Sequence, residues 1–291
     1  MSLKLKGAHA NGARRRRIRR PAAVSSLDYE VIESVDSAAE SWRRSLDAWA
    51  LPDEIVASAE ESPWIHPPEL FEVPLRIQSS PSHERAREAM PGDGTVLDVG
   101  CGGGIAAFAL TPPAAHVIGV DSQPEMLSMF RANAYKRAVT CETFEGSWPR
   151  VANEVPRVDV VTAHHVVYNV GDIVPFLEAL TSHARERVVL EMPDRHPLAP
   201  MTNAWRHFWQ LDRPEGPTPS HLLEVLAEMG ISAHREQWRG ELRVEQSLEQ
   251  AARYMRIRLC LPATREGEVR DFLSSRAVPS QRELSAIWWD A

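Results

Sequence analysis

Residues 96–104, Val-Leu-Asp-Val-Gly-Cys-Gly-Gly-Gly, constrain the fold of this chain more than any other stretch. Three apolar residues surround Asp98, which predicts a buried β-strand with a carboxylate near its end. A glycine-rich turn follows at once, and Ile105–Leu110 is then typical of a helix that packs back on the strand. A strand, a tight glycine turn and a helix N-terminus together form a cradle for a nucleotide-like ligand.

Composition narrows the class of protein. The 291 residues are 43% hydrophobic and 25% charged, which is ordinary for a globular protein with a sizeable core. There is no apolar run long enough for a transmembrane helix and no secretory signal. The three cysteines, Cys101, Cys141 and Cys260, are scattered without any Cys-x-x-Cys pair. We therefore expect a reduced, cytoplasmic protein without a metal site.

Charge is distributed unevenly along the chain. Eight of the 33 basic residues lie within residues 1–20, which contain no acid, so residues 21–291 carry a formal net charge of −15. An acidic body repels phosphate backbones, which argues against nucleic acid as the main partner. We expect residues 1–26 to be a disordered basic leader or the product of a start codon placed too far upstream. The alternative is that Arg14–Arg20 forms a nucleic-acid arm.

Residues 27–90 are predicted to form a helical N-terminal extension. Apolar residues recur at helical spacing from Tyr29 to about Glu60, and Pro52 divides that span. Three prolines then mark a linker at residues 62–68, and Ser82 opens another helix ahead of the turn at residues 91–94.

From residue 95 onward, strand and helix signals alternate. Strands are expected at 95–99, 116–120, 139–144, 158–163 and 187–192, and helices at 105–110, 124–134 and 173–185. Short apolar strands that alternate with amphipathic helices predict an α/β fold with a doubly wound, mostly parallel sheet covered on both faces. Ligands of such sheets lie at the carboxyl ends of the strands.

The alternation changes after residue 193. Residues 193–220 are rich in aromatic residues and histidine, which predicts either a substrate lid or a helix that buries its aromatic side chains. Helices are expected at 220–229, 248–259 and 265–274, and strands at 231–238 and 283–289. Together with the alternating strands and helices before residue 193, these elements are expected to form one domain at residues 91–291.

The acids near the glycine turn indicate which ligand it serves. A dinucleotide fingerprint requires Gly-x-Gly-x-x-Gly, and counted from Gly100 its sixth position is Ile105, so a nicotinamide oxidoreductase is disfavoured. A carboxylate beside a pyrophosphate would also cost Coulomb energy. Asp98 instead suits a ligand with a cationic end, such as S-adenosylmethionine.

Four motifs resemble those of class I S-adenosylmethionine-dependent methyltransferases. Val96–Gly104 resembles the first motif, and Val117–Asp121, a strand that ends in an acid, resembles the second. Glu145–Pro149 resembles the third motif, and Asp159–His165 resembles the fourth strand and its exit. The resemblance covers residues 95–192 and implies a Rossmann-like, seven-stranded sheet. It also implies S-adenosylmethionine as cofactor.

The resemblance implies a role for particular residues. Asp121 would accept both ribose hydroxyls, Met126 would lie against adenine, and Ser147 and Trp148 would flank the base. The cofactor-binding residues implied are Asp98, Gly100, Cys101, Gly102, Gly104, Asp121, Ser122, Met126, Gly146, Ser147, Trp148 and His164. Structural roles stay open for some of them: Asp121 as a helix N-cap, Ser147 as a turn residue and Trp148 as a core or rim aromatic.

Catalytic candidates follow the fourth strand. His164 and His165 would point to opposite sides if the strand continued, so one would be a core histidine and the other would face the transferred methyl group, where it could act as a general base. Structural roles for both histidines stay open. Tyr168 could reach the same pocket, and Glu191 could be a base or pair with Arg195. The two adjacent histidines have poor geometry for a metal.

The sequence therefore predicts methyl transfer from S-adenosylmethionine to a small-molecule acceptor. One departure of this chain from the family bears on the acceptor. His164-His165 follows the fourth strand in place of an Asn-Pro-Pro-Tyr-like motif, which counts against methylation of the amino groups of nucleic-acid bases. RNA or protein acceptors and a non-catalytic cofactor-binding protein are the alternatives. The sequence does not give the oligomeric state.

Overall fold

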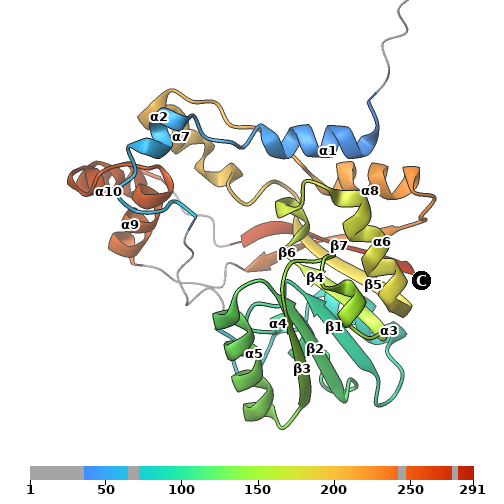
Figure 1. The fold of residues 1–291 in the computed structure, drawn as a ribbon. Helices are drawn as coiled ribbons and strands as arrows, with labels where there is room; N and C mark the ends of the chain where they lie inside the picture. The colour runs from blue at the N-terminus through green and yellow to red at the C-terminus, as the bar shows by residue number, and fades with distance from the viewer. Residues whose placement is uncertain (1–35, 65–71, 242–246, 277–280) are drawn as a thin grey trace, which may run out of the picture. The chain divides into compact units, whose positions relative to one another are not determined.

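A seven-stranded sheet forms the centre of the part of the chain that the structure describes (Figure 1). This computed structural model describes residues 36–64, 72–241, 247–276 and 281–291. The strand order is β3-β2-β1-β4-β5-β7-β6. The strands are β1 (Thr95–Val99), β2 (His116–Asp121), β3 (Thr140–Glu145), β4 (Val158–His164), β5 (Ala184–Pro193), β6 (His234–Glu241) and β7 (Gln281–Asp290).

The direction of the strands determines which of their ends meet. The pairs among β1 to β5 are all parallel, whereas β7 runs antiparallel to both β5 and β6. The beginning of β7 therefore lies beside the carboxyl end of β5, as in the pair of Pro193 with Leu284. The predicted doubly wound, mostly parallel, seven-stranded fold is confirmed.

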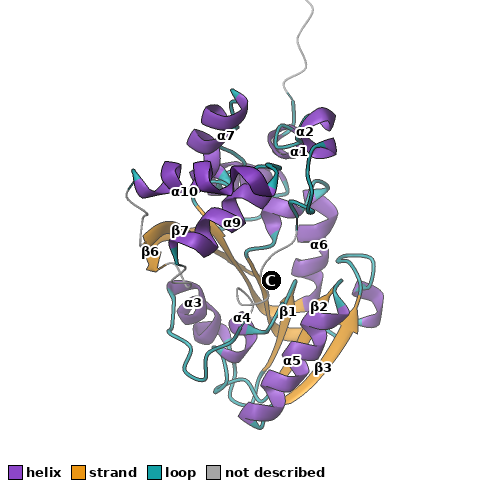
Figure 2. Ribbon diagram, turned by 90° about the vertical axis from the view of Figure 1, so that its left-hand side faces the viewer, coloured by secondary structure: helices purple, strands orange, loops and turns teal. Residues whose placement is uncertain are grey.

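Alternate residues of the strands fill two cores, one on each face of the sheet. Val96 of β1 packs on one face with Ala107 and Phe130, whereas Leu97 and Val99 pack on the other face. The first face is covered by α3 (Pro81–Ala89), α4 (Ile105–Phe108) and α5 (Pro124–Arg137). The second is covered by α6 (Ile173–His183) and α8 (Pro219–Glu228), with α1 (Ala38–Asp47) packed on both of these helices. Figure 2 shows α3, α4, α5 and α6 around the strands, and Figure 1 shows α8 beside α1 and α6.

A third core belongs to a group of helices that we call the cap. It comprises α2 (Asp53–Ala57), α7 (Thr202–Trp209), α9 (Leu248–Arg258) and α10 (Glu266–Ser274). Ile55, Trp205, Leu259 and Phe272 pack together within it. Figures 1 and 2 both place these helices on the side of the molecule away from α5 and β3. The predicted lid at residues 193–220 includes α7, and its role as a lid stays a prediction.

Several predicted boundaries move for identifiable reasons. α3 begins at Pro81 and not at Ser82, because Ser80 caps it and proline is tolerated in the first turn. α4 ends at Phe108 and not at Leu110, and Pro112 and Pro113 follow soon after.

Residues 36–291 form one compact unit, and α3, from the predicted extension at 27–90, packs directly on β5. The division at residue 90 stays a prediction. The predicted leader at residues 1–26 lies outside the described residues. Among the described helices, none has the length and apolar character needed to cross a bilayer.

Candidate functional site

Backbone hydrogen bonds fasten the carboxyl ends of β1, β2 and β3 to one another. The amides of Gly100 and Cys101 both donate to the carbonyl of Val120, at 2.8 and 3.0 Å. The amide of Gly146 donates to the carbonyl of Asp121 at 2.9 Å. The glycine turn after β1, the acid that ends β2 and the turn after β3 therefore lie side by side at the carboxyl end of the sheet, which we call the carboxyl edge.

The glycine turn has a conformation that other residues would strain. Gly100 has a φ of 68° and Gly104 a φ of 95°, both in the left-handed region that favours glycine. A Cβ atom on Gly100 would lie 2.5 Å from the side chain of Val166. The Nδ2 of Asn133, on α5, donates to the carbonyl of Gly103 at 3.0 Å and holds the turn in place. This edge is thus a backbone-lined cradle.

Asp121 already organises the cradle through its carboxylate. One oxygen accepts from the amide of Gly102 and the other from the amide of Gln123, each at 3.0 Å. Each carboxylate oxygen can accept a second hydrogen bond. The side chain can therefore hold two hydroxyl groups of a ligand and keep its backbone contacts.

Asp98 is a buried acid beneath the same turn. Its carboxyl group lies 3.1 Å from the Oγ1 of Thr162 and accepts from the amide of Ala107 at 3.3 Å. Burial raises the pKa of Asp98 to about 8, and the negative charge of Asp121 adds to that rise. At pH 7 the free chain therefore holds Asp98 mainly as the neutral acid.

The remaining cofactor candidates differ in their placement. Met126 is buried in the first turn of α5, whereas Ser122 and Ser147 are exposed. Trp148 lies against α6, where its Nε1 donates to the carbonyl of Phe176 at 3.4 Å. Its indole also forms an edge contact with His183. The cofactor roles of these residues stay predictions.

A second cluster surrounds Glu191, near the carboxyl end of β5. This carboxylate is 2% exposed. Its Oε1 lies 3.1 Å from the Nε2 of His165, and its Oε2 accepts from the hydroxyl of Ser80 at 3.1 Å. Burial alone would raise the pKa of Glu191, but the adjacent His164 and His165 outweigh burial and lower it well below its ordinary value. Glu191 is therefore an ionised carboxylate held between hydrogen-bond donors.

The two histidines lie differently from the expectation that the strand continues. β4 ends at His164, and His165 has a left-handed φ of 61°. The amide of His165 donates to the carbonyl of Glu191 at 2.7 Å, so the backbone fixes the same pair as the side chains. The ring of His164 stacks on that of His83, with centroids 5.4 Å apart. Arg195 pairs with Glu215 and not with Glu191.

Aromatic rings extend from this cluster to the cap. Tyr168 contacts His196 edge-on at 5.8 Å, and His196 stacks on Trp49 at 4.1 Å. Burial and the charge of Arg213 lower the pKa of His196 to about 4, so its ring is neutral at pH 7. Burial raises the pKa of Tyr168, which therefore stays protonated and suits a hydrogen-bond donor better than a base.

Sequence reasoning missed several residues of this cluster. Ser80 was not singled out, although Ser-Pro before a helical pattern is an N-cap signal that indicates its position. Arg282, whose Nη2 lies 3.2 Å from the Nε2 of His165, comes from a strand more than 100 residues away along the chain. No local pattern links Arg282 to His165.

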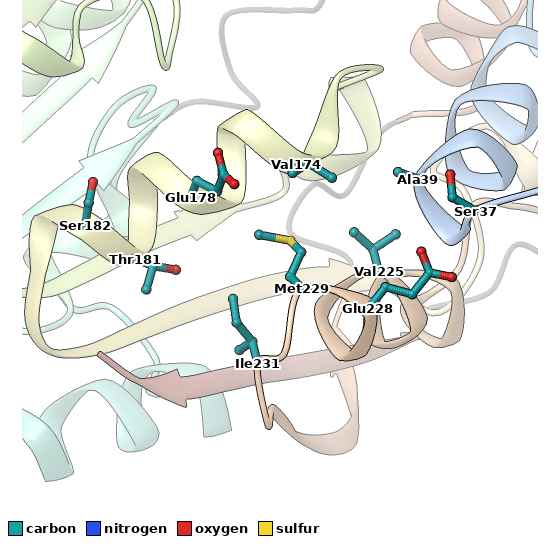
Figure 3. A pocket seen from close by; sticks show the side chains of 10 residues that line it. All are labelled: Ser37, Ala39, Val174, Glu178, Thr181, Ser182, Val225, Glu228, Met229 and Ile231. Atoms are coloured by element: carbon teal, nitrogen blue, oxygen red, sulfur yellow. The ribbon is translucent and has the colours of Figure 1, made fainter.

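A large pocket lies away from both clusters (Figure 3). Its volume is about 650 Å³, and its lining comes from α1, α6, α8 and the residues after α8. Val174, Glu178, Val225 and Met229 contribute to that lining, but no residue of the glycine turn does. Among the described residues, no group of three or more His, Cys, Asp or Glu could hold a metal ion.

Comparison with known proteins adds family evidence to this geometry. Residues 96–187 match the family model described as a methyltransferase domain. The ribosomal protein L11 methyltransferase of Thermus thermophilus is 30% identical over 187 residues, which cover 60% of this chain and 71% of that protein. The ubiquinone biosynthesis O-methyltransferase of Aeromonas salmonicida is 32% identical over 107 residues, or 36% of this chain. The chain spans 45% of the length of that relative.

A solved structure supports the fold alone. The YcgJ protein of Bacillus subtilis superposes with a TM-score of 0.51 and 17% sequence identity. The match covers 72% of this chain and 97% of that protein.

The raised pKa of Asp98 predicts a loss of stability with increasing pH. Asp98 binds its proton more tightly in the folded chain than in the unfolded chain, where its pKa is near 3.9. The free energy of unfolding should therefore fall between about pH 5 and pH 7, and Asp98 should account for about 1 kcal/mol per pH unit of that slope. Urea unfolding of the ligand-free chain at several pH values measures it.

Asp98→Asn should remove this part of the slope. Asp172→Asn, at a carboxyl group that is 73% exposed, is the control and should leave the slope unchanged. Equal slopes for the wild type and Asp98→Asn would contradict a raised pKa for Asp98.

Proposed function

The chain belongs to the class I S-adenosylmethionine-dependent methyltransferases, and we propose that it methylates a hydroxyl group of a small molecule. The observation that carries the proposal is the Glu191–His165 pair at the carboxyl ends of β5 and β4. It lies on the edge of the sheet where parallel α/β folds bind ligands.

The cradle residues fit S-adenosylmethionine. The turn places backbone where side chains would fill the space, and a Cβ on Gly100 would meet Val166. Asp121 has acceptor capacity for two ribose hydroxyls, and the buried Asp98 suits the cationic end of the ligand. When bound, S-adenosylmethionine supplies a methyl group that its sulfonium already activates.

The cofactor assignment makes Asp121 a residue whose loss should weaken binding. Hydrogen bonds to a charged acceptor contribute about 1.5–3 kcal/mol each, so the loss of two of them in Asp121→Ala should raise the Kd for S-adenosylmethionine at least ~100-fold. Isothermal titration calorimetry measures the Kd. Glu142→Gln, at an exposed carboxyl on β3, is the control and should bind as the wild type does. A folded Asp121→Ala protein with unchanged affinity would remove Asp121 from the cofactor site.

The Glu191–His165 pair can act as a general base. Because Glu191 is ionised, it holds the proton of His165 on Nε2, and Nδ1 is then the basic nitrogen of the neutral ring. His165 would take the proton of an acceptor hydroxyl, and Glu191 would stabilise the imidazolium that forms. The side chain of His165 is 22% exposed, but its Nδ1 is buried, so the acceptor hydroxyl would have to reach a nitrogen that the free chain covers.

Replacing His165 should lower turnover more than it lowers affinity. General base catalysis contributes typically 10²–10⁴-fold, so His165→Gln should reduce kcat by about 10² or more. The Kd for S-adenosylmethionine should stay within about threefold of that of the wild type. His116→Gln is the control, because His116 begins β2 at the opposite edge of the sheet. An unchanged kcat for His165→Gln would exclude the ring as the base.

A small-molecule acceptor is favoured by the charge of the chain and by the aromatic side chains near the pair. Residues 21–291 carry a net charge of −15, which opposes RNA. The buried rings of Trp49 and His196 stack on each other, and His196 also contacts Tyr168, so aromatic side chains lie close to the pair. The name of the Aeromonas relative is consistent with transfer to oxygen. The name of the Thermus relative favours the second candidate, a protein acceptor.

A labelling experiment separates the acceptor classes. The chain is incubated with S-adenosylmethionine that carries a tritiated methyl group, together with a metabolite, protein or RNA fraction of the source organism. The label should appear in the metabolite fraction, bound to oxygen. Label confined to protein or RNA would overturn the small-molecule proposal. An absence of transfer to any fraction would favour a non-catalytic cofactor-binding protein.

A further inference from the structure

Arg282 lies beside the Glu191–His165 pair although it comes from the far end of the chain. It is the second residue of β7, and β7 runs antiparallel to β5, so its guanidinium group lies at the carboxyl edge of the sheet. The Nη2 of Arg282 is 3.2 Å from the Nε2 of His165. A permanent positive charge therefore adjoins the proposed base.

Most of the hydrogen-bonding capacity of Arg282 is unused. A guanidinium group has five N–H donors. Within residues 36–64, 72–241, 247–276 and 281–291, its side chain has one contact within hydrogen-bonding distance, the one with the Nε2 of His165, which carries its own proton towards Glu191 and therefore does not satisfy a donor of Arg282. Its Nε is buried and has no hydrogen-bond partner in that part of the chain. Burying a donor without an acceptor costs about 1–3 kcal/mol, so the site favours a ligand that brings an acceptor.

Nearby acids do not satisfy Arg282. The oxygens of Glu191 accept from His165 and Ser80, and no hydrogen bond joins them to Arg282 in the described part of the chain. Other arginines of the same hairpin have acidic partners: Arg235 pairs with Asp194 at 3.0 Å, and Arg239 with Glu283 at 2.6 Å. Among the described residues, no carboxylate forms such a pair with Arg282.

Arg213 is a buried cation beside Trp49 and His196; its Nε also has no hydrogen-bond partner among the described residues, but its terminal nitrogens are occupied. Its terminal nitrogens donate to the carbonyls of Trp49 and Ala50. Its guanidinium group also lies over the rings of Trp49 and Trp205, at 5.0 and 5.5 Å. Arg213 is therefore a structural cation that holds the segment before α2 against α7.

We infer that Arg282 binds a carboxylate of the acceptor and places the acceptor hydroxyl beside His165. This inference deepens the proposed function and rests on it. A planar carboxylate matches the guanidinium fork in two parallel hydrogen bonds. A phosphate dianion would bring two negative charges close to the ionised Glu191, which a carboxylate monoanion avoids in part. Tyr168 and His196, whose rings contact each other edge-on near this cluster, are the aromatic side chains that a flat acceptor would meet.

The test compares matched pairs of charged and neutral ligands. The probes are 3,4-dihydroxybenzoate, 3,4-dihydroxycinnamate and 3,4-dihydroxyphenylacetate, each with its amide, titrated calorimetrically into the chain saturated with S-adenosylhomocysteine. At least one carboxylate should bind tenfold or more tightly than its amide. Arg282→Gln should reduce that preference to about twofold or less, and Arg282→Lys should retain part of it. Arg239→Gln, which removes a paired and exposed arginine of β6, should leave it unchanged.

Several outcomes would overturn the inference. One is that no carboxylate in the panel binds more tightly than its amide, which includes the case of no binding at all. Another is that a folded Arg282→Gln protein keeps the wild-type preference. Tighter binding of 3,4-dihydroxyphenylphosphonate, with the same sensitivity to Arg282→Gln, would overturn the choice of a carboxylate.

Failure of the proposed function would be seen separately, in methyl transfer. A carboxylate preference that depends on Arg282, without methylation of any hydroxyl in the panel, would support the binding site and count against hydroxyl transfer. Methylation of a carboxylate and its amide with equal KM values would support hydroxyl transfer and overturn the role of Arg282.

Discussion

The buried carboxylate of Glu191 is the interaction on which the arrangement of the candidate acceptor site depends. An ionised carboxylate that loses its partners inside a protein costs several kcal/mol, so the groups around it are constrained to stay. Ser80 reaches it from the N-cap of α3, and His165 reaches it from the turn after β4. The N-terminus of α3 also favours a negative charge. One side chain thus fixes three segments of the chain relative to one another.

The need of Glu191 for hydrogen-bond partners also accounts for the backbone conformation of His165. A left-handed conformation is unfavourable for a residue with a side chain, by about 1–2 kcal/mol. Here it lets both the amide and the ring of His165 reach Glu191, at 2.7 and 3.1 Å. Two hydrogen bonds, one of them to a charged group, offset that strain. The left-handed turn at His165 is therefore explained by the contacts with Glu191 that it makes possible.

Strand order determines how much of this could be predicted from the sequence. The alternating apolar pattern and the motif at residues 96–104 were enough to predict the sheet and the cradle at the carboxyl ends of its strands. Both depend on residues that are neighbours along the chain. The contact of His165 with Glu191 requires that β4 and β5 pair in parallel with a particular register. The contact of Arg282 requires that β7 run antiparallel beside β5. The position of the Trp148 indole against α6 could not be predicted either, because the motif around Trp148 does not show which helix packs there.

Two buried acids on the same edge show why burial alone does not determine charge. Asp98 has an acidic neighbour in Asp121, and its pKa rises to about 8. Glu191 has histidines beside it, and its pKa falls. A cationic ligand over β1 would reverse the balance at Asp98 and release a proton, whereas Glu191 is ionised before any ligand arrives. The carboxylate that holds the proposed base is therefore ionised independently of the cofactor, and Asp98 is the buried acid from which a bound cation would release a proton.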